Sequence, residues 1–168
     1  MQIIEALQLI NTLPDRSVLE VSNDVESILL QYGYKIESSD LERPWGAFHK
    51  VSNADSFARD FFDLELTGDL DAKIMVVAPH MRLSWQFHYL RNELWKFITD
   101  GYYVKSKLNK QTRRKKAKQN TILTIETLER HRLIGGKNFT IVAEIWDNVN
   151  GQSSECDIVR LEDDFRRL

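Results

Sequence analysis

The stretch Ser84 to Trp95, SWQFHYLRNELW, decides the fold and the site of this chain. If its first half is a strand, side chains alternate between the two faces, so Gln86 and His88 point the same way, roughly 7 Å apart. Glu93 follows just beyond, at the start of an apolar run that reads as the next strand, and its carboxylate can enter the same space. His131, in the sequence ERHRL, can converge with them on a single metal ion.

Nitrogen and oxygen donors of this kind suit zinc, manganese, nickel or iron, and geometry selects among these metals. A His-x4-Glu pair also has a simpler interpretation, in which a buried histidine is bonded to a neighbouring carboxylate. Both interpretations stay open on this segment alone. We expect His49 and His80 to lie at the surface or behind the metal ligands rather than to bind the metal.

Length and composition set the class of protein. A chain of 168 residues is long enough for one domain with a full core and too short for two ordinary ones. The net charge of −2 gives no overall attraction to nucleic acid or membrane, and the single Cys156 excludes an internal disulfide. No segment has the pattern of a secretory signal or the length to cross a bilayer, so we expect a soluble cytoplasmic protein.

Three helices are expected in the first part of the chain. Apolar residues recur at helical spacing in residues 1–10, and Asn23 can cap a second helix that ends near Gly33. Ser52 or Asn53 can cap a third, through Phe62. We expect residues 1–40 to form a helical extension that covers a sheet edge or pairs with a second subunit, and residues 41–168 to form the main domain.

From residue 70 onward the pattern is β. Short apolar runs are separated by turn signals such as Asp100-Gly101 and Gly135-Gly136. This spacing favours a mainly β sandwich or jelly roll over a parallel α/β sheet. The predicted strands are 73–78, 83–90, 94–98, 102–106, 121–126 and 139–146, whereas residues 40–46 (DLERPWG) are predicted to be a turn-rich approach to them.

Three separated blocks resemble the mannose-6-phosphate isomerase domain of the type II phosphomannose isomerase family, in the cupin superfamily. They are RPWG at residues 43–46, RLSWQFHYLRNELW at residues 82–95 and DIVRLEDDF at residues 157–165. The order and spacing of the blocks match that family over residues 40–168. The resemblance implies a cupin double-stranded β-helix, or jelly roll, that binds one divalent metal ion.

Carried over by position, the resemblance implies that His88, Glu93 and His131 are metal ligands. Leu90 stands where cupins usually have a further histidine, and Gln86 can make up the deficit, because type I phosphomannose isomerases use a Gln, His, Glu, His zinc set. The expected ligands are therefore Gln86, His88, Glu93 and His131, with zinc first and manganese, nickel or iron as alternatives. The usual Pro-x-Gly turn before the last histidine is missing in residues 125–131.

The implied reaction is aldose–ketose isomerisation of mannose 6-phosphate to fructose 6-phosphate or of a related sugar phosphate. It needs an electrophile to polarise oxygens and a base to move a proton. The candidate catalytic residues are Arg91, where the family also has arginine, and Glu144, which either points inward or is solvated. Phosphate capture favours arginine, and Arg43, Arg132 and Arg160 are the candidates, with structural salt bridges as the alternative for each.

Two other functions stay open. Leu90 and the missing turn favour a non-catalytic cupin that binds a sugar or another small ligand. Residues 105–118 carry eight Lys or Arg and no acid, which is compatible with polyanion binding, although a solvated hairpin loop beside the barrel mouth is the simpler interpretation. We expect a sugar-phosphate ligand, no membrane partner, nucleic acid only as a less favoured partner, and dimerisation as an option.

Overall fold

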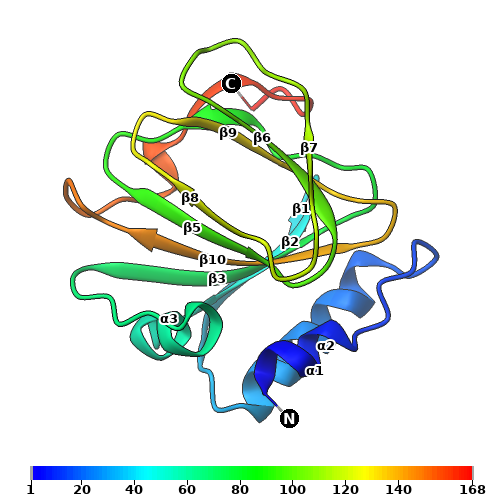
Figure 1. The fold of residues 1–168 in the computed structure, drawn as a ribbon. Coiled ribbons are helices and arrows are strands. Elements are labelled where there is room, and N and C mark those ends of the chain that lie inside the picture. Colours follow the sequence, from blue (N-terminus) through cyan, green and yellow to red (C-terminus); the bar gives the residue numbers. More distant parts are fainter. Residues whose placement is uncertain (1, 168) are drawn as a thin grey trace.

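The computed structural model describes residues 2–167 as two facing antiparallel sheets, with three helices on the outer side of the larger sheet (Figure 1). The six-stranded sheet has the order β1 (Ile36–Arg43), β2 (Gly46–Val51), β3 (Leu70–Val77), β10 (Thr140–Asp147), β5 (Asn92–Phe97) and β8 (Ile122–Ile125). The five-stranded sheet has the order β11 (Val159–Glu162), β4 (Trp85–Phe87), β9 (Arg130–Ile134), β6 (Gly101–Ser106) and β7 (Lys115–Ala117). The mainly β prediction is confirmed.

Most predicted strands are present, and the differences have physical causes. The predicted strand 83–90 shortens to β4, which ends at Phe87 because the chain turns at residues 88–91. Strand β1 was missed because it is a largely exposed, polar edge strand without apolar alternation, and the expected turn at 40–46 occupies only the tip of the β1–β2 hairpin. Strand β9 is absent from the strands predicted by alternation because it begins with the charged sequence Arg130-His131-Arg132.

The helices are α1 (Ile3–Gln8), α2 (Val18–Gln31) and α3 (Ala54–Phe62), and a single 3-10 turn, η1, spans Glu155–Asp157. Helix α2 begins earlier than predicted. Its N-cap is Ser17, whose hydroxyl accepts from Glu20 N while the Glu20 carboxylate accepts from Ser17 N. This reciprocal capping box satisfies two free helix donors, which places Asn23 inside the helix instead of at its start.

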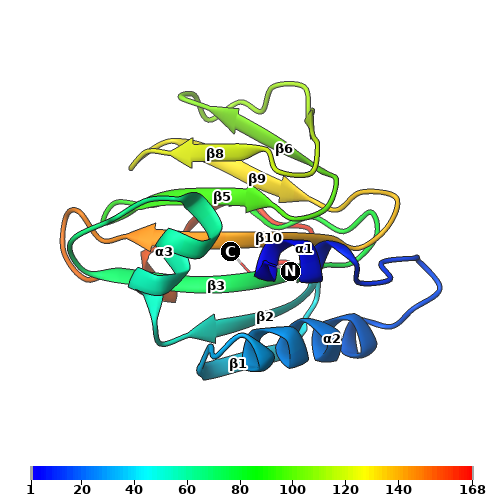
Figure 2. The same ribbon diagram turned by 60° about the horizontal axis from the view of Figure 1, so that its bottom comes forward.

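The helices pack on a face of the six-stranded sheet, not on its edge (Figure 2). Alternation along β10 explains this: Ile141, Ala143 and Ile145 point to the helices, whereas Val142 and Trp146 point between the sheets. In the outer cluster Phe57 and Phe61 of α3 stack at 4.1 Å between ring centroids. Within residues 2–167 no helix has both the length and the apolar character that a bilayer-spanning segment requires.

The space between the sheets is apolar at one end and polar at the other. Trp45, Met75, Phe97 and Leu133 are among the side chains that fill the apolar end. Polar and charged side chains from β4, β5, β9 and β10 are buried at the polar end, where the candidate site lies. The fold therefore keeps these groups out of bulk water.

His49 departs from the expectation of a surface position. It is fully buried under α2, with Nε2 2.8 Å from Ser22 Oγ and Nδ1 2.7 Å from Ser39 Oγ. Burial lowers the pKa of His49 because the imidazolium loses its solvation, and the opposing effect of Glu26 is smaller. The neutral imidazole thus links α2 to the β1–β2 hairpin.

We predict that His49 makes the protein less stable in mild acid. Because its pKa is lower in the folded state, the unfolded chain binds a proton first as pH falls through about 6.5, and the free energy of unfolding then decreases. The free energy of unfolding of metal-free protein can be measured by urea denaturation at about pH 7.5 and about pH 5.5. Its decrease between the two pH values should be smaller in His49→Gln than in wild type. Equal losses in the two proteins would contradict this assignment.

Candidate metal centre

Three donor side chains from both sheets meet at the polar end of the barrel: His88 just after β4, Glu93 on β5 and His131 on β9. Each is at most 2% exposed. His88 Nε2 lies 3.0 Å from Glu93 Oε1, His131 Nε2 lies 3.3 Å from Glu93 Oε2, and the two Nε2 atoms are 3.2 Å apart. The predicted convergence of these residues is thus observed in the structure.

The three separations have the size that a shared metal ion requires. A tetrahedral ion with bonds of ~2.0–2.1 Å holds its ligand atoms about 3.3 Å apart. The observed separations of 3.0, 3.2 and 3.3 Å are close to this value, although the two contacts of Glu93 involve different carboxylate oxygens. The donor set therefore fits a small divalent cation.

The outer nitrogen of each imidazole faces a backbone carbonyl. His88 Nδ1 is 3.1 Å from Asp157 O, and His131 Nδ1 is 2.9 Å from Glu129 O. A carbonyl oxygen only accepts, so both Nδ1 atoms donate, and in a neutral ring the lone pair is then on Nε2, facing the other donors. Burial lowers the pKa of His88 despite the opposing effect of Glu93, which favours the neutral form that binds metals.

Glu93 supplies the negative charge of the centre. Arg91 Nε donates to Oε1 at 2.9 Å, and Trp95 Nε1 donates to Oε2 at 3.1 Å. Glu93 is therefore an ionised, oriented carboxylate beside two imidazole lone pairs.

Gln86 lies next to these donors, with its amide Nε2 3.4 Å from His88 Nε2, while the Ser84 hydroxyl donates to its Oε1. A hydroxyl both donates and accepts, so Ser84 can also bond the amide rotated by 180°. That rotation would turn the Gln86 oxygen toward the donors. The backbone N–H of Leu90 donates to Asp157 Oδ2 at 3.1 Å, and its aliphatic side chain offers no ligand atom.

Arg91 is a buried cation that joins the centre to the loop 148–157, called the strap below. Besides Glu93, its guanidinium donates through Nη1 to Ser153 Oγ at 2.7 Å, and its Nη2 lies 3.2 Å from His88 Nε2. Its Cζ lies 3.6 Å from the centroid of the Trp146 ring. Arg91 is thus held in place from several sides and borders the cavity described next.

Glu144 points inward and borders the same cavity, so of the two orientations considered from the sequence the structure has the inward one. It accepts from Trp95 Nε1 and Trp146 Nε1, each at 2.9 Å, and lies 3.0 Å from Lys73 Nζ. Burial raises the pKa of Glu144, with Lys73 acting in the opposite direction and Glu93 adding to the rise. Because Trp95 Nε1 also bonds Glu93, Glu144 is one hydrogen-bonded residue away from the donors.

A small cavity of about 40 Å³, room for about three water molecules, adjoins the donors. Among residues 2–167, five basic and three acidic side chains line it, which is an excess of two positive charges. The charged lining comprises Arg43, Lys73, Arg91, Arg160 and Arg167 against Glu93, Glu144 and Glu155. Within the described residues 2–167, Arg160 Nε is buried without an acceptor, and Arg43 Nε is 2.8 Å from Asp40 but outside hydrogen-bond geometry.

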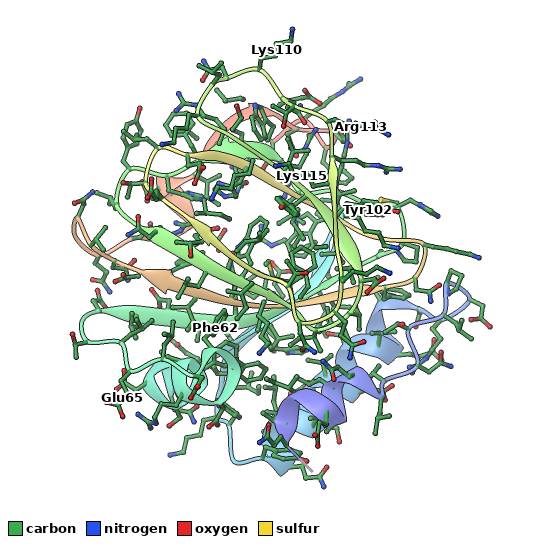
Figure 3. The ribbon with its side chains drawn as sticks, in the orientation of Figure 1. Phe62, Glu65, Tyr102, Lys110, Arg113 and Lys115 are labelled. Atoms are coloured by element: carbon green, nitrogen blue, oxygen red, sulfur yellow. The ribbon has the colours of Figure 1, made fainter. Side chains whose placement is uncertain are left out.

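Arg132 and the basic segment lie elsewhere. Arg132 donates through Nε to Leu83 O at 2.7 Å and pairs with Glu162 at 3.0 Å, so it holds β11 and does not line the cavity. Residues 105–118 comprise the end of β6, the loop to β7, β7 itself and residue 118, and none of them lines the cavity. Figure 3 shows Lys110, Arg113 and Lys115 directed away from the barrel.

Sequence reasoning missed several parts of the site. The inward position of Lys73 could have been predicted from the sequence, because Lys73 alternates in phase with Met75 and Val77 on the inner face of β3. Trp95 lies in an apolar alternation that is typical of a core residue, yet its indole N–H bridges two carboxylates. Arg167 had no local signal, because only the tertiary fold brings it to the cavity.

Solved structures similar to this one share its fold at low sequence identity. Oxalate decarboxylase from Bacillus subtilis at pH 4.6 has 13% identity and a TM-score of 0.56 over 74% of this chain. A tryptophan variant of the same enzyme has 14% identity and a TM-score of 0.55 over 73%. This chain covers 30% of each of those chains. No curated protein sequence matches it.

The family comparison agrees with the resemblance seen in the sequence blocks. The sequence model of the family described as "Mannose-6-phosphate isomerase C-terminal" matches residues 34–163, which include every donor of the centre. The two-sheet architecture is that of a cupin, or double-stranded β-helix. The chain therefore belongs to the mannose-6-phosphate isomerase C-terminal family of cupins.

Proposed function

We propose that this chain is a metal-assisted sugar-phosphate isomerase that interconverts mannose 6-phosphate and fructose 6-phosphate or a related aldose–ketose pair. The observation that carries the proposal is the meeting of two Nε2 lone pairs and the Glu93 carboxylate beside a cavity with excess positive charge. Family membership supports the same reaction. A cytoplasmic location, a homodimer and a division of the chain at residue 40 stay predictions.

His88, Glu93 and His131 would hold the metal, with Gln86 as a fourth ligand after rotation of its amide. Two nitrogen and two oxygen ligands suit zinc first, and manganese, nickel or iron as alternatives. When bound, the ion would polarise the carbonyl and hydroxyl oxygens of the sugar. We therefore propose one divalent metal ion per chain.

The proton transfer is assigned to Glu144. A carboxyl whose pKa is raised by burial is better matched to proton exchange near neutral pH than an ordinary exposed one. Trp95, Trp146 and Lys73 fix its two oxygens, so the group is oriented before a substrate arrives. Arg91 would stabilise negative charge that develops on a substrate oxygen, because its guanidinium borders the cavity.

The phosphate is assigned to Arg43 and Arg160, with Arg167 beside them. Both predicted residues line the cavity, and each has a guanidinium N–H that finds no hydrogen-bond acceptor in the part of the chain that the structure describes. An excess of two positive charges complements a phosphate dianion. Arg132 bonds Leu83 and Glu162 and does not line the cavity, so direct phosphate binding by Arg132 is less favoured.

A hexose phosphate needs more room than the cavity of about 40 Å³. A second pocket of about 330 Å³ adjoins it and shares the walls formed by Phe48, Lys73, Trp146 and Glu155. Of these, Glu155 is on the strap and pairs with Lys73 at 3.6 Å. We propose that the sugar extends from the cavity into this pocket when the Glu155 side chain moves aside.

One observation favours a non-catalytic cupin that binds a sugar without converting it. Arg91 Nη2 is within 3.2 Å of His88 Nε2, so in this arrangement an internal cation faces the lone pair that a metal would use. Polyanion binding by residues 105–118 also stays a prediction. Metal-loaded protein without isomerase activity on any hexose phosphate would favour the non-catalytic function.

We predict near-stoichiometric zinc, manganese, nickel or iron in the purified protein, measured by elemental analysis. His88→Ala should lose the metal, because it removes a ligand. Its metal affinity should fall by more than the ~10–100-fold that follows when only a hydrogen-bond partner of a ligand is removed. His80→Asn is the matched control, because His80 is exposed and asparagine tolerates its positive φ of 62°. The assignment of the metal centre would be contradicted if wild type bound no metal after reconstitution, or if His88→Ala bound as much metal as wild type.

We also predict separate kinetic effects for the assigned groups. Glu144→Gln should lower kcat for the isomerisation by about 10²-fold or more, because the proton acceptor is lost. Arg160→Ala should raise KM for the sugar phosphate by roughly tenfold or more, because a charge-assisted hydrogen bond is lost. Arg59→Ala, on the surface of α3, is the control and should change neither constant. Unchanged kinetics in Glu144→Gln would rule that residue out as the base.

A further inference from the structure

We infer that Asp157 is a positioning residue that selects which side chains of residues 86–90 reach the metal. The inference rests on the metal centre of the proposed function and goes beyond it. Asp157 contacts this segment twice: its backbone carbonyl accepts from His88 Nδ1 at 3.1 Å, and its carboxylate accepts from the backbone N–H groups of Tyr89 and Leu90 at 3.0 and 3.1 Å.

The two backbone bonds to one carboxylate exclude a continued strand. In an extended strand successive N–H groups point to opposite edges, so a single side chain cannot accept from both. Two adjacent N–H groups converge on one anion only where the backbone turns. The carboxylate of Asp157 therefore stabilises the turn that ends β4 at Phe87.

This turn changes the ligand set. If β4 continued, Gln86, His88 and residue 90 would all lie on one face by alternation. With the turn in place, His88 is held by the Asp157 carbonyl, whereas the backbone N–H of Leu90 bonds the Asp157 carboxylate, so strand alternation no longer places residue 90 on the face of Gln86 and His88. The Leu90 carbonyl accepts from Asn150 N at 3.0 Å, so the strap holds this residue from its other side as well. Of the side chains at residues 86–90, Gln86 is then the remaining candidate for a fourth protein ligand beside His88.

Asp157 also reaches Glu93 indirectly. Its Oδ2 accepts from Ser153 Oγ at 2.9 Å, Ser153 Oγ accepts from Arg91 Nη1 at 2.7 Å, and Arg91 Nε donates to Glu93 at 2.9 Å. The Asp157 side chain is only 5% exposed, and backbone and side-chain donors together hold the pKa of this carboxyl below its ordinary value despite partial burial. Asp157 thus holds His88 through its backbone carbonyl, while its carboxylate fixes the turn after His88 and reaches Glu93 through Ser153 and Arg91.

A residue with only a structural role would change stability and leave the identity of the ligands unchanged. The test is therefore the metal itself, added to the full chain as Co²⁺, with the dissociation constant obtained by competition with a chelator and the coordination followed by the visible spectrum. The variants are Asp157→Ala, Leu90→His and the double variant. Asp164→Ala is the matched control, since Asp164 pairs with Arg82 and does not touch the donors.

Leu90→His alone should leave Co²⁺ affinity within about twofold of wild type, because residue 90 does not face the donors, and Asp157→Ala should weaken it by ~10–100-fold. The double variant should recover at least about tenfold over Asp157→Ala and give a new Co²⁺ spectrum, since the freed segment can present the introduced imidazole as a ligand. Asp164→Ala should bind as wild type does. If Asp157→Ala does not fold, Asp157→Asn, which keeps one acceptor oxygen, replaces it in both variants.

Three results would overturn the inference. They are a tenfold gain in affinity from Leu90→His alone, wild-type affinity in Asp157→Ala, and a double variant no better than Asp157→Ala. Wild type that binds Co²⁺ but lacks isomerase activity would refute the proposed reaction and leave this inference intact. Wild type that binds no Co²⁺ would overturn both the metal centre and the role of Asp157.

Discussion

The site depends on two hydrogen bonds from imidazole to backbone. His88 donates to the carbonyl of Asp157 and His131 to the carbonyl of Glu129, so both Nε2 lone pairs face Glu93 in the interior. Acceptors only 3.0–3.3 Å apart, shielded from water, repel one another unless a cation lies among them. Arg91 partly meets this need, and a divalent ion would meet it fully.

The fold makes this arrangement possible by separating two interiors. Alternation along β10 sends one set of side chains to the helices and the other between the sheets, where Glu144 and Trp146 border the cavity. The helices thus seal the outer face and contribute no residue to the cavity lining. Trp95 connects the apolar and polar ends, because its ring packs in the core while its N–H bonds both Glu93 and Glu144.

Much of this could be predicted from residue types at regular spacing. Strand alternation together with the family resemblance was sufficient to bring His88, Glu93 and His131 together and to place Arg43 and Arg160 near them. Interactions between distant segments were not predictable, because they produce no repeating pattern of residue types in the sequence. The turn after β4 is one example, because it depends on Asp157, 67 residues beyond Leu90. Arg132 is another, since its neighbours Leu83 and Glu162 become known only with the fold.

The central claim concerns the protonation of two imidazoles, and ¹⁵N NMR of the histidine side chains in metal-free protein tests it most directly. The account predicts that His88 and His131 are neutral with the proton on Nδ1, and that Zn²⁺ shifts the Nε2 resonance of both. His49 and His80 serve as internal references and should not respond to Zn²⁺. A proton on Nε2 of His88 or His131, or Nε2 resonances insensitive to Zn²⁺, would contradict the account.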